Sequence, residues 1–236
     1  MDLNPIKCLN FDNSDLVQAH DSGLAVFDFD KTITYHDSFI EFLFFIEGGE
    51  KKLILKIIKN YCLFFYTIKY YFGFISNEEI VELYLHEFFK SQNVNKVNDM
   101  IQQFQEHLNA TLNNDALHRI KWHKQQKHLV VIVSATPDIL LIPFCEKNNL
   151  KLIASKLEVK EQMYTGNFHG SECNGKEKVQ QIKKRLGPVE TFRNIYAYGD
   201  DKLDIPMLTL APKCNQFYRA NFKKLRDCNN VSTKRS

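Results

Sequence analysis

The fold class is indicated most clearly by one stretch of sequence, Leu24-Ala25-Val26-Phe27-Asp28-Phe29-Asp30-Lys31-Thr32. Its first four residues are apolar and lead directly into Asp28, with Asp30 two positions further on. A continuous apolar run of this kind is typical of a strand buried on both faces of a parallel sheet. Open α/β sheets bind their ligands outside the carboxyl ends of such strands. We therefore expect Asp28 and Asp30 to lie at a ligand-binding edge.

Two more apolar runs end in polar residues in the same way. Residues 128–133 precede Ser134, and residues 195–198 precede Gly199 and Asp200. The weaker strand candidates are residues 152–154 and 213–217, and the helices expected between strands are residues 137–148 and 175–186. Strands that alternate with helices predict an α/β fold, with a Rossmann-like parallel sheet and helices on both of its faces.

The chain between the first two strands has a different pattern. Residues 37–121 show helical periodicity and contain no convincing strand, so we expect an all-helical insert. The predicted division is an α/β core of residues 1–36 and 122–225, a helical cap of residues 37–121, and a flexible basic tail of residues 226–236. With 236 residues, 44% hydrophobic and 25% charged, the chain has ordinary globular composition.

The overall charge and the cysteine pattern exclude several classes of function. A net charge of +3 does not favour nucleic acid as a partner. The six cysteines are scattered and form no CxxC pair, which argues against a zinc ribbon and favours reduced thiols. Residues 1–20 contain no apolar signal segment, and no apolar run approaches the length of a spanning helix. We expect a cytoplasmic protein.

The first and third strand ends bring several carboxylates to one sheet edge. Like charges held this close repel and raise one another's pKa, and a hard cation resolves the conflict. Mg²⁺ prefers oxygen ligands and leaves room for a substrate phosphate, so the sequence predicts a Mg²⁺ site. Lys176 and Lys178 open the helix before the third strand and could offset phosphate charge. The carboxylates are Asp28, Asp30, Asp200, Asp201 and Asp204.

Together these residues resemble the haloacid dehalogenase-like hydrolases, over residues 24–211. The first motif of that family is two aspartates flanking one residue and then threonine, as in Asp28-Phe29-Asp30-Lys31-Thr32. Ser134 matches the second motif, and Lys178 matches the third better than Lys176 does. Gly199-Asp200-Asp201-Lys202-Leu203-Asp204 matches the fourth.

The resemblance implies a reaction and a role for each residue. Asp28 would attack phosphorus and form an aspartyl-phosphate, and Asp30 would protonate the leaving oxygen and later activate water. The implied Mg²⁺ ligands are Asp28, the main-chain carbonyl of Asp30, and Asp200. The implied phosphate contacts are Ser134, Lys178 and Thr32. Asp204 would orient the lysine or a metal-bound water, and Asp201 would lie beside the site, with a water-mediated contact at most.

An early insert resembles the type C1 cap of subfamily IB, which contains phosphoserine phosphatase and phosphatidylglycerophosphatase C. Residues 173–179 and 198–208 look most like the latter group, as does Asp37-Ser38-Phe39. The phosphoserine enzyme uses a cap arginine, and this chain has no arginine before Arg119. Asp37 nevertheless lies where that enzyme has an acidic cap residue. His36 is a further candidate for substrate contact.

Residues 51–77 form a segment that is aromatic, basic and free of Asp and Glu. On a helical wheel, residues 53, 57, 61, 64, 68 and 72 share one face. Such a stripe is typical of a buried cap core, but it also fits an interfacial helix in peripheral contact with a membrane.

The leading function is a Mg²⁺-dependent phosphomonoesterase acting on an apolar or lipid-like phosphoester. The alternatives are a phosphatase for small metabolites such as phosphoserine, a phosphoprotein phosphatase, and a non-enzymatic membrane- or protein-binding module.

Overall fold

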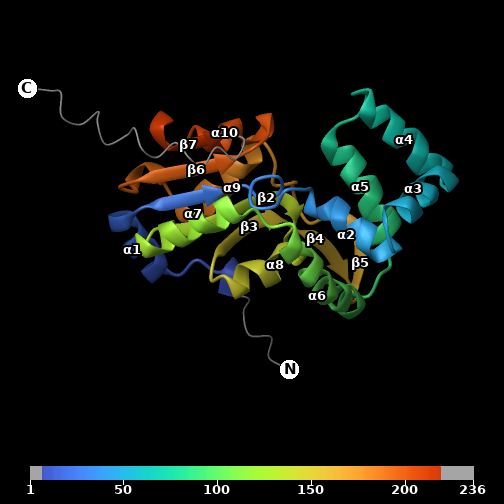
Figure 1. The fold of residues 1–236 in the computed structure, drawn as a ribbon, viewed down its shortest axis with the longest axis horizontal. Helices are drawn as coiled ribbons and strands as arrows, with labels where there is room; N and C mark the ends of the chain where they lie inside the picture. The colour runs from blue at the N-terminus through green and yellow to red at the C-terminus, as the bar shows by residue number, and fades with distance from the viewer. Residues whose placement is uncertain (1–6, 219–236) are drawn as a thin grey trace, which may run out of the picture.

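A five-stranded, wholly parallel sheet lies at the centre of the protein, in the order β3-β2-β1-β6-β7 (Figure 1). The computed structural model describes residues 7–218, so the expected tail of residues 226–236 lies outside the described residues. The strands of the central sheet are β1 (Leu24–Phe27), β2 (Leu129–Pro137), β3 (Lys151–Ser155), β6 (Ile195–Gly199) and β7 (Gln216–Tyr218).

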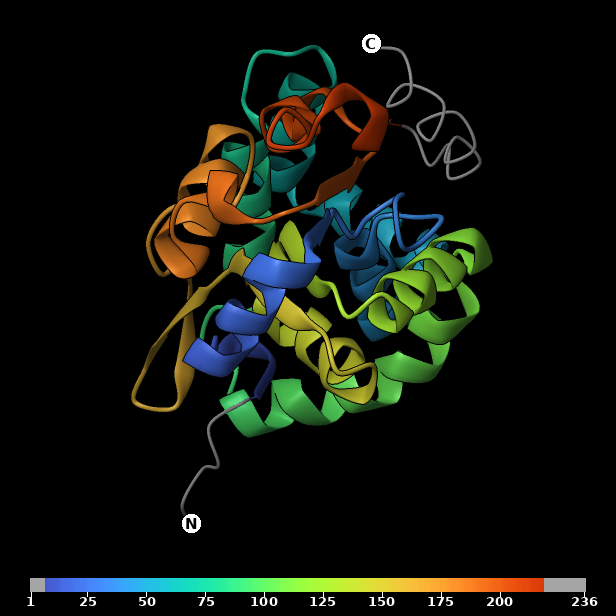
Figure 2. The same ribbon diagram turned by 90° about the vertical axis from the view of Figure 1, so that its left-hand side faces the viewer.

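Helices cover both faces of this sheet, which confirms the expected fold class. In Figure 2, α9 (Lys176–Leu186, orange) and α7 (Asn114–Gln125, yellow-green) lie on opposite sides of the strands. Alternate residues of β1 divide between the two faces: Ala25 and Phe27 pack with α7 and α8, and Leu24 and Val26 pack with α1 and α9. These helices and the short α10 are α1 (Asn13–Ser22), α7 (Asn114–Gln125), α8 (Asp138–Lys147), α9 (Lys176–Leu186) and α10 (Ile205–Leu208).

Aromatic rings cross the sheet on the face covered by α7. The rings of Phe27, Tyr198 and Phe217 stack in a row over β1, β6 and β7. His123 of α7 is fully buried beside them, and its Nε2 lies 2.8 Å from the Tyr198 hydroxyl. Its Nδ1 lies 2.8 Å from a ring nitrogen of His128. Burial and the neighbouring His128 lower the pKa of His123 to about 2, so the ring is neutral in the folded protein.

Six helices occupy the chain between β1 and β2, as the periodicity predicts. The two connections to the core run side by side, because Thr34 and Leu112 form an antiparallel bridge. The expected boundary at residues 121 and 122 falls inside α7, which packs on β2. The first five of these helices are α2 (Ser38–Glu47), α3 (Glu50–Lys59), α4 (Tyr61–Tyr71), α5 (Asn77–Phe88) and α6 (Val94–Ala110).

The continuous amphipathic stripe expected from residue 53 to residue 72 is not what the structure shows. The helix breaks at Asn60, whose side chain caps α4 by accepting a hydrogen bond from the Leu63 amide at 3.1 Å. Leu53 is buried, but Tyr61 and Phe72 are 82% and 66% exposed. The expectation of a buried stripe is therefore wrong, because the break at Asn60 changes the direction of the second half.

The sequence patterns missed α1, α10 and a hairpin, and they misplaced the last strand. A two-stranded antiparallel hairpin, β4 (Leu157–Lys160) and β5 (Met163–Phe168), follows β3 and packs on α5. Its strands are short and mostly polar on one side, so they lack the continuous apolar run of a core strand. The last strand covers residues 216–218, while residues 213–215 form a 3₁₀ turn. Among residues 7–218, no helix combines the length and apolar character needed to cross a membrane.

Candidate active site

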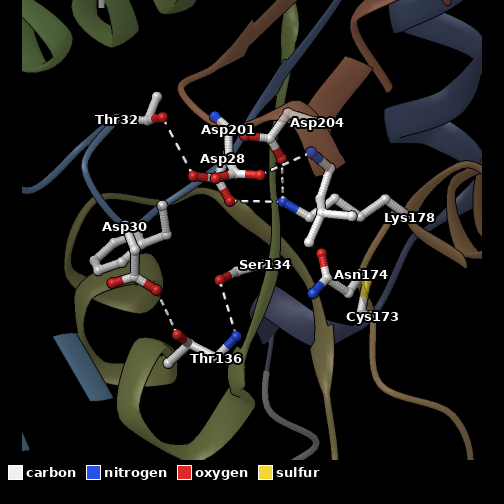
Figure 3. A network of polar contacts seen from close by, with 12 residues as sticks. Asp28, Asp30, Thr32, Ser134, Thr136, Cys173, Asn174, Lys178, Asp201 and Asp204 are labelled. Atoms are coloured by element: carbon white, nitrogen blue, oxygen red, sulfur yellow. Dashed lines mark hydrogen bonds and ion pairs between the residues drawn. The ribbon is translucent and has the colours of Figure 1, made fainter. Parts of the chain in front are cut away.

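Asp28 follows the last residue of β1, at the carboxyl edge of the sheet (Figure 3). Asp28 is 6% exposed, and its carboxylate accepts two side-chain hydrogen bonds. Lys178 donates from Nζ to Oδ1 at 2.6 Å, and Thr32 donates from its hydroxyl to Oδ2 at 3.2 Å. Burial raises the pKa of Asp28 to about 8, with Lys178 opposing the rise and Asp204 and Asp30 adding to it. A carboxylate so placed needs additional positive charge to stay ionised at neutral pH.

Lys178 joins the first and fourth motifs through two buried ion pairs. Its Nζ lies 2.6 Å from Asp28 Oδ1 and 2.6 Å from Asp204 Oδ1. Burial alone would lower the pKa of Lys178, but the two carboxylates outweigh it and raise that pKa above its ordinary value. Lys176 is exposed, and of the two lysines it is Lys178 that contacts Asp28.

Asp204 reaches this position because the backbone comes very close to it at Gly199. A Cβ atom built on Gly199 would lie 2.5 Å from the Asp204 Cβ, so only glycine fits there. The second Asp204 oxygen accepts backbone amide hydrogen bonds from Asp200 at 3.0 Å and Asp201 at 3.2 Å. Asp204 thereby fixes the shape of the loop after β6 as well as the Lys178 side chain.

The Asp30 side chain points away from Asp28, toward the end of β2 (Figure 3). One carboxylate oxygen accepts from the Ser38 amide at 2.6 Å, and the other accepts from the Thr136 hydroxyl. Burial and the nearby Asp37 carboxylate raise the pKa of Asp30 to about 6, while the Ser38 and Thr136 hydrogen bonds limit the rise. A pKa close to neutrality suits a residue that both donates and accepts a proton.

Three carboxylates are close enough to share a cation. One oxygen from each of Asp28, Asp200 and Asp204 can be chosen so that all lie within 4.8 Å of one another. Burial and the Asp204 charge also raise the pKa of Asp200. Hard oxygen donors at this separation fit a divalent cation such as Mg²⁺. Both Asp204 oxygens are already engaged by Lys178 and the loop amides, which leaves Asp28 and Asp200 as the more available ligands.

A cavity of about 440 Å³ opens over these groups. Its floor is the sheet edge, with Asp28, Ser134 and Lys178. Its opposite wall comes from α2, α4 and α5 and is largely apolar. The residues of that wall are Phe39, Ile40, Thr67, Tyr70, Asn77, Ile80, Val81 and Tyr84.

The structure places most of the predicted site residues around this cavity. Ser134 is buried at its floor, and its hydroxyl accepts from the Thr136 amide at 3.1 Å. Asp37 lines the cavity and caps α2 by accepting from the Ile40 amide. Asp201 also lines it and caps the 3₁₀ turn Lys202–Asp204 by accepting from Leu203.

Two predicted residues lie elsewhere. Thr32 is fully buried and does not line the cavity, so its hydroxyl contacts Asp28 where a phosphate contact was expected. His36 is exposed and also lies outside the cavity wall.

Sequence reasoning assigned no role to Thr136, Glu172 or Asn174, which all line the cavity. Thr136 holds Asp30, and its position two residues after Ser134 is the signal that could have identified it. Glu172 is 8% exposed and accepts from the Asn77 side chain of α5 at 3.2 Å. This hydrogen bond joins the core to the inserted helices, and no spacing in the sequence indicates it.

Comparison with known proteins gives one family match. The haloacid dehalogenase-like hydrolase model matches residues 25–209. The protein CicA of Caulobacter vibrioides is 28% identical over 196 residues, which cover 81% of this chain and 84% of CicA.

Solved structures share the fold. A Bordetella pertussis Tohama I protein of unknown function has a TM-score of 0.69 at 22% identity, covering 79% of this chain and 85% of that one. A phosphoserine phosphatase, solved as a phospho-aspartyl intermediate analogue, has a TM-score of 0.56 at 25% identity, covering 80% and 82% of the two chains.

Proposed function

The chain belongs to the haloacid dehalogenase-like hydrolase family, and on that premise we propose a Mg²⁺-dependent phosphomonoesterase with Asp28 as nucleophile. The expected phosphatase class is confirmed by the family and by phosphatase neighbours. The observation that carries the proposal is the buried Asp28 carboxylate, held 2.6 Å from Lys178 on the floor of the cavity. Resemblance to subfamily IB and to phosphatidylglycerophosphatase C stays a prediction.

The reaction has two balanced displacements. In the first, an Asp28 oxygen forms a bond to phosphorus, the ester P–O bond breaks, and the leaving oxygen takes a proton from Asp30. In the second, Asp30 takes a proton from water, the water oxygen bonds to phosphorus, and the bond to Asp28 breaks. Phosphate leaves, and both aspartates return to their starting forms.

The surrounding residues support both steps by charge and by position. Lys178 and the Ser134 hydroxyl lie where they can bind the transferring phosphoryl oxygens, and such preorganised donors stabilise the developing charge. Thr136 and the Ser38 amide hold Asp30 in place. Asp28, Asp200 and the Asp30 carbonyl would hold Mg²⁺, which supplies positive charge to the phosphoryl group.

The cavity wall favours an apolar leaving group. Opposite the catalytic floor, Phe39, Ile80, Val81 and Tyr84 offer apolar surface. Among residues 7–218, the basic side chains that line the cavity are those of Lys31 and Lys178, and Lys178 is already paired with Asp28. An anionic group on the leaving part of the substrate would meet little positive charge there. An apolar or lipid-like phosphoester is therefore the leading substrate class.

A small-metabolite substrate is the second candidate, because Asp37 lines the cavity and could bind an ammonium group. A phosphoamino acid, free or within a protein, fits that observation. Its carboxylate would need Lys31. A cytoplasmic location stays a prediction, as does contact of residues 51–77 with a membrane.

The decisive experiment is phosphate release from p-nitrophenyl phosphate, with and without Mg²⁺. Wild type should turn over only with the metal, Asp28→Asn should be inactive, and the exposed control Asp99→Asn should match wild type. Turnover by Asp28→Asn would refute the nucleophile. A panel of detergent-dispersed alkyl phosphate, phosphoserine and a phosphopeptide then separates the substrate classes.

A further inference from the structure

The exposed apolar surface of the protein is concentrated on α3, α4 and the turn after them. Among residues 7–218, 16 large hydrophobic residues are exposed, and 11 of them lie between residues 54 and 74. Scattered exposed hydrophobics are normal, but a continuous patch marks an interaction site. We call this patch the outer face, with Ile54, Leu55 and Ile58 from α3 and Phe64, Phe65 and Ile68 from α4.

The exposed residues follow helical spacing, so each helix has a complete apolar stripe that faces away from the protein. On α4, the exposed residues 61, 64, 65 and 68 lie on one side of the helix, and the cap residue 72 continues that side. The opposite side of α4 faces the catalytic cavity through Thr67 and Tyr70. In Figure 1, α3 and α4 lie at the end of the molecule remote from β7. The outer face and the cavity are thus separated by the width of one helix, about 10 Å.

Lysines outnumber acidic residues around the outer face, where Glu50 opens α3 and Glu47 pairs with Lys56 at 2.8 Å. Residues 51–77 contain five lysines and no Asp or Glu. Lys51, Lys52 and Lys59 are exposed and flank the apolar stripe of α3. Lys69 lies over the Phe65 ring, with 4.7 Å between Nζ and the ring centroid. Aromatic rings bordered by lysines are suited to a surface whose interior is apolar and whose boundary is anionic.

We propose that the outer face of α3 and α4 docks on an anionic lipid bilayer. The two helices have 10 and 11 residues, so each is about 15 Å long and fits along the interface. The lysines contact lipid phosphates while the apolar stripes enter the acyl boundary. The cavity then opens within one helix width of the bilayer. Delivery of an apolar phosphoester from the bilayer rests on the proposed function, whereas docking itself does not.

A second copy of the chain is the competing occupant, and charge argues against it. A two-fold contact through this face would place the five lysines of residues 51–77 near those of the other copy, with Glu50 as the one acidic residue of α3 and α4 to compensate. An anionic membrane supplies negative charge for the exposed Lys51, Lys52 and Lys59.

The test is co-sedimentation of the full chain with vesicles of phosphatidylcholine alone or with 30% phosphatidylglycerol. Binding should require the anionic lipid and weaken at 1 M salt, where charges are screened within about 3 Å. Lys51→Gln/Lys59→Gln should lower the partition coefficient about 25-fold, from about fivefold per lysine. Lys121→Gln/Lys147→Gln, which removes two exposed lysines elsewhere, should bind like wild type.

Apolar contact is tested by Phe65→Ser/Phe72→Ser, with Tyr35→Ser/Val159→Ser as the control. The first variant should lose at least tenfold in partition, and the control should not, because its residues are equally exposed but lie elsewhere. Turnover of p-nitrophenyl phosphate and circular dichroism should stay unchanged in both. Absence of wild-type binding to anionic vesicles, or binding insensitive to the outer-face variants, would overturn the proposal. The proposal would also be overturned if the wild-type chain formed dimers but did not bind vesicles, and if Phe65→Ser/Phe72→Ser abolished those dimers.

Asp28→Asn keeps the outer face intact and should bind vesicles like wild type. Failure of docking with normal Mg²⁺-dependent turnover rejects this inference alone. Docking without turnover rejects the proposed function alone.

Discussion

Replacing Lys178 by methionine should destabilise the protein and remove most of its activity. Its ammonium lies 2.6 Å from two carboxylates, and all three groups are buried. At an effective dielectric constant of 20, each contact corresponds to about 6 kcal/mol of Coulomb energy, most of which is offset by desolvation. Methionine keeps the length of the side chain but leaves Asp28 and Asp204 without their shared cation. Breaking a buried pair in this way costs about 3–5 kcal/mol.

The matched control is Lys176→Met, two residues earlier on the same helix and exposed. Urea unfolding at pH 7.5 without metal should show the loss of about 3–5 kcal/mol for Lys178→Met and a change within about 0.5 kcal/mol for the control. Phosphate release with Mg²⁺ should fall about 10²- to 10³-fold for Lys178→Met, since a donor to the phosphoryl oxygens is lost. Equal stability of the two variants, or a larger activity loss in Lys176→Met, would refute the assignment of the third motif.

Three further perturbations follow from described contacts. Gly199→Ala puts a Cβ 2.5 Å from that of Asp204, so urea unfolding should show a loss of about 2 kcal/mol or more, and wild-type stability would contradict the packing. Asp30→Asn should lower kcat about 10²- to 10⁴-fold with an unchanged circular dichroism spectrum, and near-normal turnover would exclude Asp30 as acid and base. His123 has a folded pKa of about 2, below its unfolded value, so its contribution to stability is complete above about pH 6.5 and is lost as pH falls. Between pH 7 and pH 5.5 the unfolding free energy should therefore fall by about 1.2 kcal/mol more in wild type than in His123→Gln, and equal slopes would show that His123 is not buried neutral.

The sequence predicts the core well because buried parallel strands have a simple signature. β1 matches the predicted residues 24–27, and the runs ending at Ser134 and Asp200 lie beside it in the sheet. Topology then brings Asp28 and Asp200 to one edge, as expected for carboxyl ends of parallel strands. Family membership makes the alternative of a purely non-enzymatic module unnecessary.

What the sequence could not provide depends on contacts between distant segments. The hydrogen bond from Thr136 to Asp30 spans 106 positions, and that from Asn77 to Glu172 spans 95. The break at Asn60 is a local cap that a helical wheel does not detect, since the wheel assumes one straight helix. Whether an apolar stripe faces the core or the solvent depends on that break.

The β4–β5 hairpin gives the inserted helices a third point of attachment. Beside the two connections at residues 34 and 112, backbone hydrogen bonds join Ser91 to Tyr164 and Tyr164 to Gln92, at 2.8 and 3.0 Å. With two neighbouring attachment points, the inserted helices could rotate as a unit about the line that joins these points. A third, separate attachment point prevents this rotation. Wide opening of all the inserted helices would have to break the hairpin contacts. We therefore expect substrate to enter and leave through a local displacement of α3 and α4, which extend beyond the three attachment points. In this motion α5 and α6 stay in place against the core.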